Sequence, residues 1–154
     1  MSETAAFEIV EHEARVTAVV RGTVAMTDLA GFFDRSFGLL APTLADQGVV
    51  PQSAAFALYR SVPTDVVDLE VGFVTDRAVQ PTDDVVVSEL PGGTVARTVH
   101  AGSFDGLGDA WGALMGQVVA QGRTPGTMWE VYLTEPSPDM DPADLRTELV
   151  VVVS

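Results

Sequence analysis

Three side chains are of types that can contribute charge, hydrogen bonds and aromatic surface to a binding site. Glu130 and Tyr132 lie two residues apart in the segment MWEVYLTE, and Trp111 lies upstream in a helical pattern. A β-strand alternates its side chains between two faces. The alternation places Met128, Glu130 and Tyr132 on one face and Trp129, Val131 and Leu133 on the other. Both faces are largely apolar, so the strand is expected to hold a carboxylate in a core-like environment.

Burying an isolated carboxylate costs several kcal/mol, so another interaction must offset this cost. An arginine, protonation of the acid or a bound cation could each supply it. Aromatic neighbours would suit the cation, since ring faces such as those of Trp111, Tyr59 and Tyr132 attract one by roughly 0.5–2 kcal/mol each. The alternatives stay open: a solvated strand residue, or an ion pair with an arginine such as Arg97 or Arg146.

The elements that position these residues form an internal repeat, in which each half has the order strand, helix, strand, strand. The first half contains RVTAVVRGTV, the helical stretch 27–48, AFALYRS and VVDLEVGFV. The second contains GTVARTVHAGS, the helical stretch 104–122, MWEVYLT and LRTELVVVV. This alignment places Tyr59 opposite Tyr132, Glu70 opposite Glu148, and Ala57 opposite Glu130. We therefore expect an α+β fold with an antiparallel sheet and two main helices.

The two helical stretches have different characters. The first has apolar residues at the spacing of a helix with one buried face. Thr27 or Asp28 can cap its N-terminus, and Gly48 can cap its C-terminus. Pro42 is expected to kink the helix or to shorten it. The second has Gly108, Gly112 and Gly116 in one row, and each glycine costs about 1 kcal/mol of helix stability. The row predicts close approach of a neighbouring backbone or space beside Trp111.

The ordered set of motifs resembles the GyrI-like domains. These motifs are LPGGTVARTVHAGSFDGLGDAWGALMGQVVAQG, WEVYLTEP, RTELVV, FALYRS and DLEVGFV. GyrI-like domains are effector-binding domains of bacterial multidrug-responsive transcription regulators and also occur as stand-alone proteins. The resemblance spans nearly the whole chain, so we expect one domain over 1–154 with a pseudo-repeat of about 7–76 and 84–154. The chain departs from the pattern at Phe104, where a tyrosine is frequent, and at Gln117, where a tryptophan is frequent.

The resemblance also implies a site. It implies a ligand cavity between the two halves, with Glu130 as the central acid that faces lipophilic cations. Tyr59, Trp111 and Tyr132 match positions near that cavity. Met115 and Phe73 complete the expected ligand-contacting set, with ordinary core packing as the alternative for both.

The composition of the chain limits the kinds of molecule that we expect the protein to bind. The formal net charge is −14, which repels nucleic acids and anionic membranes. The chain has no cysteine and no cluster of metal ligands around His12 or His100, so no metal or cofactor is expected. It shows no signal peptide, no membrane span and no helix-turn-helix. We expect a cytoplasmic monomer that does not bind DNA directly.

Three functions compete. The first is a stand-alone protein that binds lipophilic, cationic or aromatic small molecules, for sensing or sequestration. If it senses them, we expect a regulator protein as its partner. The second is a hydrolase, as in relatives that act on reactive cyclopropane-bearing compounds, with Glu130 as acid or base. The third is an acidic protein partner of DNA gyrase. The first is favoured, and on that hypothesis the protein is not an enzyme.

Overall fold

The computed structural model describes residues 7–60, 64–134 and 139–154. Part of the acidic N-terminal segment, Ser61 of the motif AFALYRS, and the end of the motif WEVYLTEP lie outside these residues. The chain divides into two compact units. We call Glu13–Gly92 the continuous unit and the described parts of Met1–His12 and Gly93–Ser154 the split unit. The chain passes from one unit to the other after His12 and again after Gly92.

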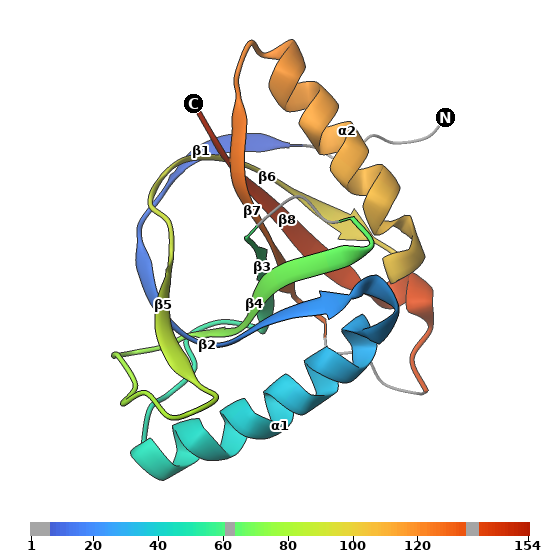
Figure 1. Ribbon diagram of the computed structural model, residues 1–154. Helices are drawn as coiled ribbons and strands as arrows, with labels where there is room; N and C mark the ends of the chain where they lie inside the picture. Colours follow the sequence, from blue (N-terminus) through green and yellow to red (C-terminus); the bar gives the residue numbers. More distant parts are fainter. Residues whose placement is uncertain (1–6, 61–63, 135–138) are drawn as a thin grey trace. The chain divides into compact units, whose positions relative to one another are not determined.

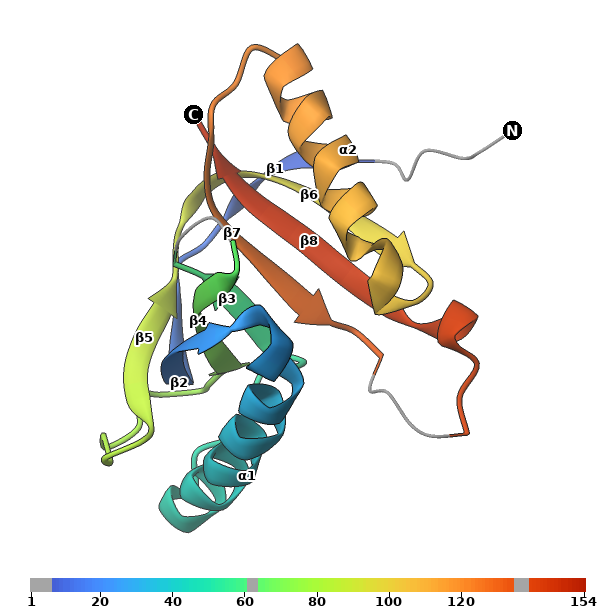
Figure 2. The same ribbon diagram turned by 45° about the vertical axis from the view of Figure 1, so that its right-hand side comes forward.

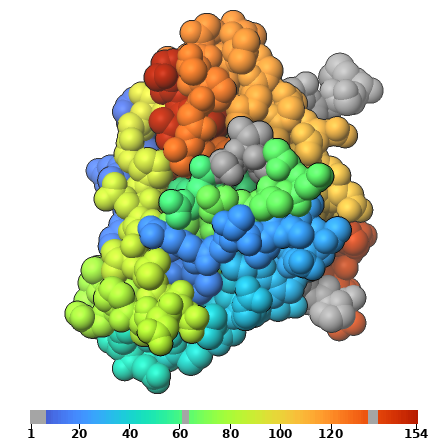
Figure 3. Space-filling view, viewed as in Figure 1, coloured from blue at the N-terminus to red at the C-terminus, as the bar shows by residue number. Residues whose placement is uncertain are grey.

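The continuous unit is a four-stranded antiparallel sheet with one long helix (Figure 1). Its elements are β2 (Arg15–Ala25), η1 (Met26–Asp28), α1 (Leu29–Gln47), β3 (Phe56–Tyr59), β4 (Val66–Val74) and β5 (Val86–Leu90). The strand order is β3-β4-β2-β5. Helix α1 packs on β2 and β4 through Phe32, Leu40 and Leu44, which are buried. Figure 3 shows the opposite side of α1 at the surface, beside β2.

The split unit repeats this arrangement (Figure 2). Its elements are β1 (Glu8–His12), β6 (Gly93–Ala101), η2 (Phe104–Gly106), α2 (Leu107–Ala120), β7 (Pro125–Tyr132), η3 (Pro142–Asp144) and β8 (Arg146–Val153). The strand order is β1-β6-β8-β7, and all pairs are antiparallel. The predicted α+β class and the repeated order strand, helix, strand, strand are thereby confirmed.

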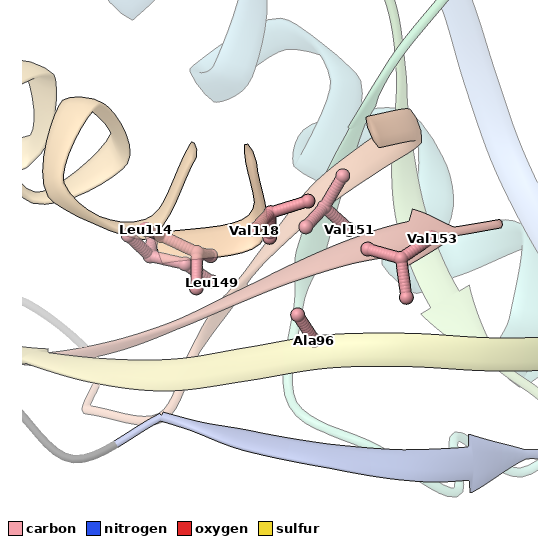
Figure 4. Packing of buried hydrophobic residues seen from close by; sticks show 6 residues of the cluster. All are labelled: Ala96, Leu114, Val118, Leu149, Val151 and Val153. Atoms are coloured by element: carbon pink, nitrogen blue, oxygen red, sulfur yellow. The ribbon is translucent and has the colours of Figure 1, made fainter. Parts of the chain in front are cut away.

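A cluster of buried apolar side chains fixes α2 on its sheet (Figure 4). Leu114 and Val118 of α2 lie against one face of β6 and β8. The cluster consists of Ala96, Leu114, Val118, Leu149, Val151 and Val153. Its strand members alternate along β8, so the residues between them point to the opposite face of the sheet. This packing defines the helix-facing side of the split unit, on which the candidate site lies.

The strand registers agree with the alignment of the two halves. Ala57 pairs with Val71 in the continuous unit, and Glu130 pairs with Leu149 in the split unit. In the next pair along, Leu58 faces Glu70 and Val131 faces Glu148. Glu70 and Glu148 thus hold equivalent places in the two ladders, as the alignment predicts. The limits of the repeat, 7–76 and 84–154, and the extent of a single domain over 1–154 stay predictions.

Two strands lie outside the predicted repeat of strand, helix, strand, strand. β1 pairs with β6, and β5 pairs with β2, so each extends one unit by an edge strand. The sequence LPGG connects two strands, β5 and β6. These strands belong to different units, however, and pair with different neighbours.

The helix ends follow the predicted chemistry in part. Gly48 caps α1 in the left-handed conformation, with φ of 64°, as expected for a C-terminal glycine. Asp28 is the N-cap residue, but its side chain makes no capping hydrogen bond. Helix α1 continues through Pro42 to Gln47, so the proline does not shorten it.

The glycine row of α2 faces open space. A Cβ atom added to Gly108, Gly112 or Gly116 would meet no atom of a neighbouring residue within 4 Å, and all three residues are exposed. The predicted close approach of another backbone is therefore wrong for the described part of the chain. The glycines instead lower the intrinsic stability of the helix that carries Trp111.

Substituting alanine for each of these glycines is expected to stabilise the protein. Each change should raise the free energy of unfolding by up to about 1 kcal/mol, because alanine has the higher helix propensity and meets no steric obstacle. Urea denaturation of the single and triple variants measures the gain. A loss of stability in the single variants would show that this face of α2 is covered in solution.

Candidate functional site

The site is built on β7, beneath α2. Glu130 and Tyr132 lie on the same face of β7, two residues apart. In the register of the sheet Glu130 pairs with Leu149, which belongs to the cluster packed against α2. This face of β7 therefore points toward the helix. The packing of α2 brings Trp111, one of its partly buried residues, to the same side.

Two aromatic side chains hold the carboxylate of Glu130. The indole Nε1–H of Trp111 donates a hydrogen bond of 2.7 Å to Oε2. The phenol O–H of Tyr132 donates one of 2.9 Å to Oε1. Glu130 itself is only 3% exposed. The three residues named first from the sequence thus form one connected cluster, here called the Glu130 cluster.

Phe104 extends the Glu130 cluster toward solvent. Its ring meets the ring of Tyr132 edge to face, with centroids 5.9 Å apart and an interplanar angle of 76°. Phe104 belongs to η2, just before α2, and is 41% exposed. The sequence identified it only as a departure from the family pattern. Its edge contact with Tyr132 depends on how η2 joins the helix, which no local pattern indicates.

Neither solvent nor the two arginines named from the sequence accounts for Glu130 in this geometry. A residue that is 3% exposed is not a solvated strand residue. Arg97 instead forms an ion pair with Glu8 on β1, at 3.0 Å. Arg146 donates to the carbonyl oxygens of Ala143 and Leu145.

The continuous unit contains a second buried acid with a different environment. Glu70, 4% exposed, accepts a hydrogen bond of 2.5 Å from Nε of Arg21 and one of 2.7 Å from the hydroxyl of Ser88. Arg21 and Glu70 are paired in the register of β2 and β4. This is a structural ion pair across two strands. The two donors to Glu130 described above, an indole and a phenol, are in contrast uncharged.

The other predicted site residues are divided between the two units. Met115 packs against the cluster beneath α2, which agrees with a core role. Phe73 lies on β4 and meets Phe37 of α1 edge to face, with ring centroids 5.8 Å apart. Tyr59 ends β3 and is partly buried. That Tyr59 and Phe73 contact the same ligand as Glu130, in a cavity between the halves, stays a prediction.

The described residues contain neither a cluster of metal ligands nor a helix that could span a membrane. In the stretches 7–60, 64–134 and 139–154, no three His, Asp or Glu side chains gather as they would around a metal ion. No helix of this part of the chain is long and apolar enough to span a membrane.

Comparison with known proteins identifies the family. A sequence profile of the GyrI-like small molecule binding domain matches residues 5–154. The chain belongs to the GyrI-like small-molecule-binding family. No curated protein matches this GyrI-like chain.

Solved structures share its fold at low sequence identity. The C-terminal domain of EcmrR is 18% identical, with a TM-score of 0.85 and 99% of each chain covered. In its complex with DNA, EcmrR is longer, and this GyrI-like chain spans 58% of it. SAV2435 bound to tetraphenylphosphonium is 13% identical, with 97% and 94% of the chains covered and a TM-score of 0.68. A hydrolase from Listeria innocua is 12% identical, with 99% and 94% covered and a TM-score of 0.65.

Proposed function

We propose that this GyrI-like domain binds lipophilic cations, for sensing or sequestration, and that Glu130 selects them by charge. The observation that carries the proposal is the Glu130 cluster. A buried carboxylate is held from both sides by the N–H of Trp111 and the O–H of Tyr132. Family membership supports a small-molecule ligand, and a protein of the same fold, SAV2435, has been solved with tetraphenylphosphonium.

The two parts of the cluster have separate roles in this proposal. Apolar contact with aromatic rings supplies most of the affinity, because such pockets bury most of the surface of a ligand. The rings of Trp111, Tyr132 and Phe104 also present π faces that attract large, weakly hydrated cations. The carboxylate rejects anions, because in a partly desolvated site charge acts more strongly than in water.

Tetraphenylphosphonium and tetraphenylborate provide a direct test, because they have nearly the same size and shape and opposite charges. We expect the cation to bind in the micromolar range and the anion at least about tenfold more weakly. Tryptophan fluorescence reports binding, and Trp111→Phe separates the signal of Trp111 from that of the buried Trp129. Equal affinity for the two ions, or no binding of the cation, would refute the proposal.

A hydrolase is the second candidate, because the phenol of Tyr132 lies 2.9 Å from an oxygen of Glu130. In that function Glu130 would take a proton from water while the water oxygen bonds to an electrophilic carbon, and the leaving group would take up a proton. The Listeria innocua hydrolase of similar fold gives this candidate support. Product formation detected by mass spectrometry, lost in Glu130→Gln and kept in Trp111→Phe, would favour it. The gyrase-partner hypothesis rests on the acidic charge alone.

A further inference from the structure

A buried hydroxyl lies beside the Glu130 cluster. Thr147 of β8 has no exposed surface. Its Oγ1 atom has no hydrogen-bond partner within residues 7–60, 64–134 and 139–154. Buried polar atoms are nearly always hydrogen-bonded, because an unsatisfied one loses its interaction with water and gains nothing in return. Two other buried hydroxyls of the described residues, Thr17 and Ser36 in the continuous unit, share this state, but Thr147 is the one beside the Glu130 cluster.

The register of the sheet places Thr147 in the site. Thr147 pairs with Tyr132 on β7 and with His100 on β6, so the three form one row across the sheet. Thr147 lies two residues from Leu149, which packs against α2, and therefore points to the helix-facing side. On that side Thr147 and Glu130 are diagonal neighbours across two strands, a separation that side chains can span with a shared contact.

The neighbours in the row direct their polar atoms elsewhere. Nε2 of His100 lies 2.9 Å from the carbonyl oxygen of Ser103, to which it must donate, since a carbonyl only accepts. The phenol of Tyr132 donates to Glu130. Neither of these hydrogen bonds satisfies Thr147. The row thus presents an unsatisfied hydroxyl oxygen next to a carboxylate.

We propose that Thr147 is a second polar contact of the ligand site and that the ligand is a lipophilic cation bearing N–H groups, such as a protonated amine. This inference rests on the proposed function and narrows its ligand class. A carboxylate and a hydroxyl both accept hydrogen bonds, so a single ammonium group can donate to the two acceptors. A fully alkylated cation carries the same charge but has nothing to donate to Thr147.

The test uses two probes that differ only at nitrogen: 1-naphthylmethylammonium and its N,N,N-trimethyl derivative. Calorimetric titrations compare the wild type with Thr147→Val, which keeps the shape and removes the hydroxyl, and Thr147→Ser, which keeps the hydroxyl. We expect Thr147→Val to weaken the primary ammonium about tenfold and the trimethyl probe by less than about twofold. Thr147→Ser should retain most of the preference for the primary ammonium.

Stability in the absence of ligand gives an independent readout. If the hydroxyl is unsatisfied, Thr147→Val should leave the urea midpoint unchanged or raise it. A clear fall in the midpoint would mean that the hydroxyl already has a structural partner, such as a buried water, and would overturn the proposal. An equal loss of affinity for both probes, or no loss for either, would also overturn it.

The failure of the proposed function has a different signature. In that case neither probe binds the wild type, or both bind Glu130→Gln as well as they bind the wild type. If both probes bind and depend on Glu130 while Thr147→Val has no selective effect, only the inference about Thr147 fails.

Discussion

Replacing Glu130 with glutamine is expected to weaken the binding of tetraphenylphosphonium by about tenfold to a hundredfold. Glutamine has the size of glutamate but no charge, and its NH2 group replaces one of the two carboxylate oxygens that accept from Trp111 and Tyr132. The variant therefore loses the attraction for the cation. Tryptophan fluorescence titration measures the change. The ratio of the affinities for tetraphenylphosphonium and tetraphenylborate should also be lower in the variant than in the wild type.

Glu148→Gln is the matched control. It removes the same charge from the adjacent strand, but Glu148 pairs with Val131 and therefore points to the other face of the sheet. Its effect on tetraphenylphosphonium should stay below about twofold, since only the long-range field changes. If the two variants weaken the cation equally, the general acidity of the protein selects the ligand and Glu130 has no special role.

Gly72→Ala is expected to destabilise the protein by roughly 3 kcal/mol or more. A Cβ atom at Gly72 would overlap the carbonyl oxygen of Ala18 and lie 2.9 Å from the Cα of Val19. Both are backbone atoms of β2, which pairs with β4, so the overlap can be relieved only if the two strands move apart. Because domains are stable by only about 5–15 kcal/mol, the urea midpoint should fall sharply.

Gly38→Ala makes the same chemical change in α1, at a position with no neighbouring atom within 4 Å of the added Cβ. It should be neutral or stabilising. A Gly72→Ala protein with the midpoint of the wild type would show that β2 and β4 can move apart there at little cost.

Much of the fold follows from local patterns. Apolar spacing determines α1, and the alternation in MWEVYLTE correctly places Glu130 and Tyr132 on one face. The edge strands β1 and β5 were not included in the predicted repeat, because their sequences, EIVEH and VVSEL, are short and mix charged with apolar residues. Such strands are defined by their partners, β6 and β2, and not by their own composition.

The site could be predicted only in part, because hydrogen bonds between elements depend on how a helix is rotated on its sheet. The family resemblance implied that Trp111 lies near the acid, but not that its indole N–H donates to Oε2 at 2.7 Å. Thr147 was not singled out, since a threonine in a valine-rich strand looks like any β-branched residue. Its significance appears only when the register sets it between His100 and Tyr132.

Because the continuous unit is inserted within the sequence of the split unit, the two units can fold only in a fixed order during translation. A ribosome releases the chain from the N-terminus, so β2, α1, β3, β4 and β5 emerge before Gly93, together with all their partners within that unit. β1 must wait for β6, and both β6 and β7 need β8, the last described strand. A nascent chain can therefore hold a finished continuous unit long before Glu130 is enclosed. The proposed ligand site can therefore form only once translation has passed β8.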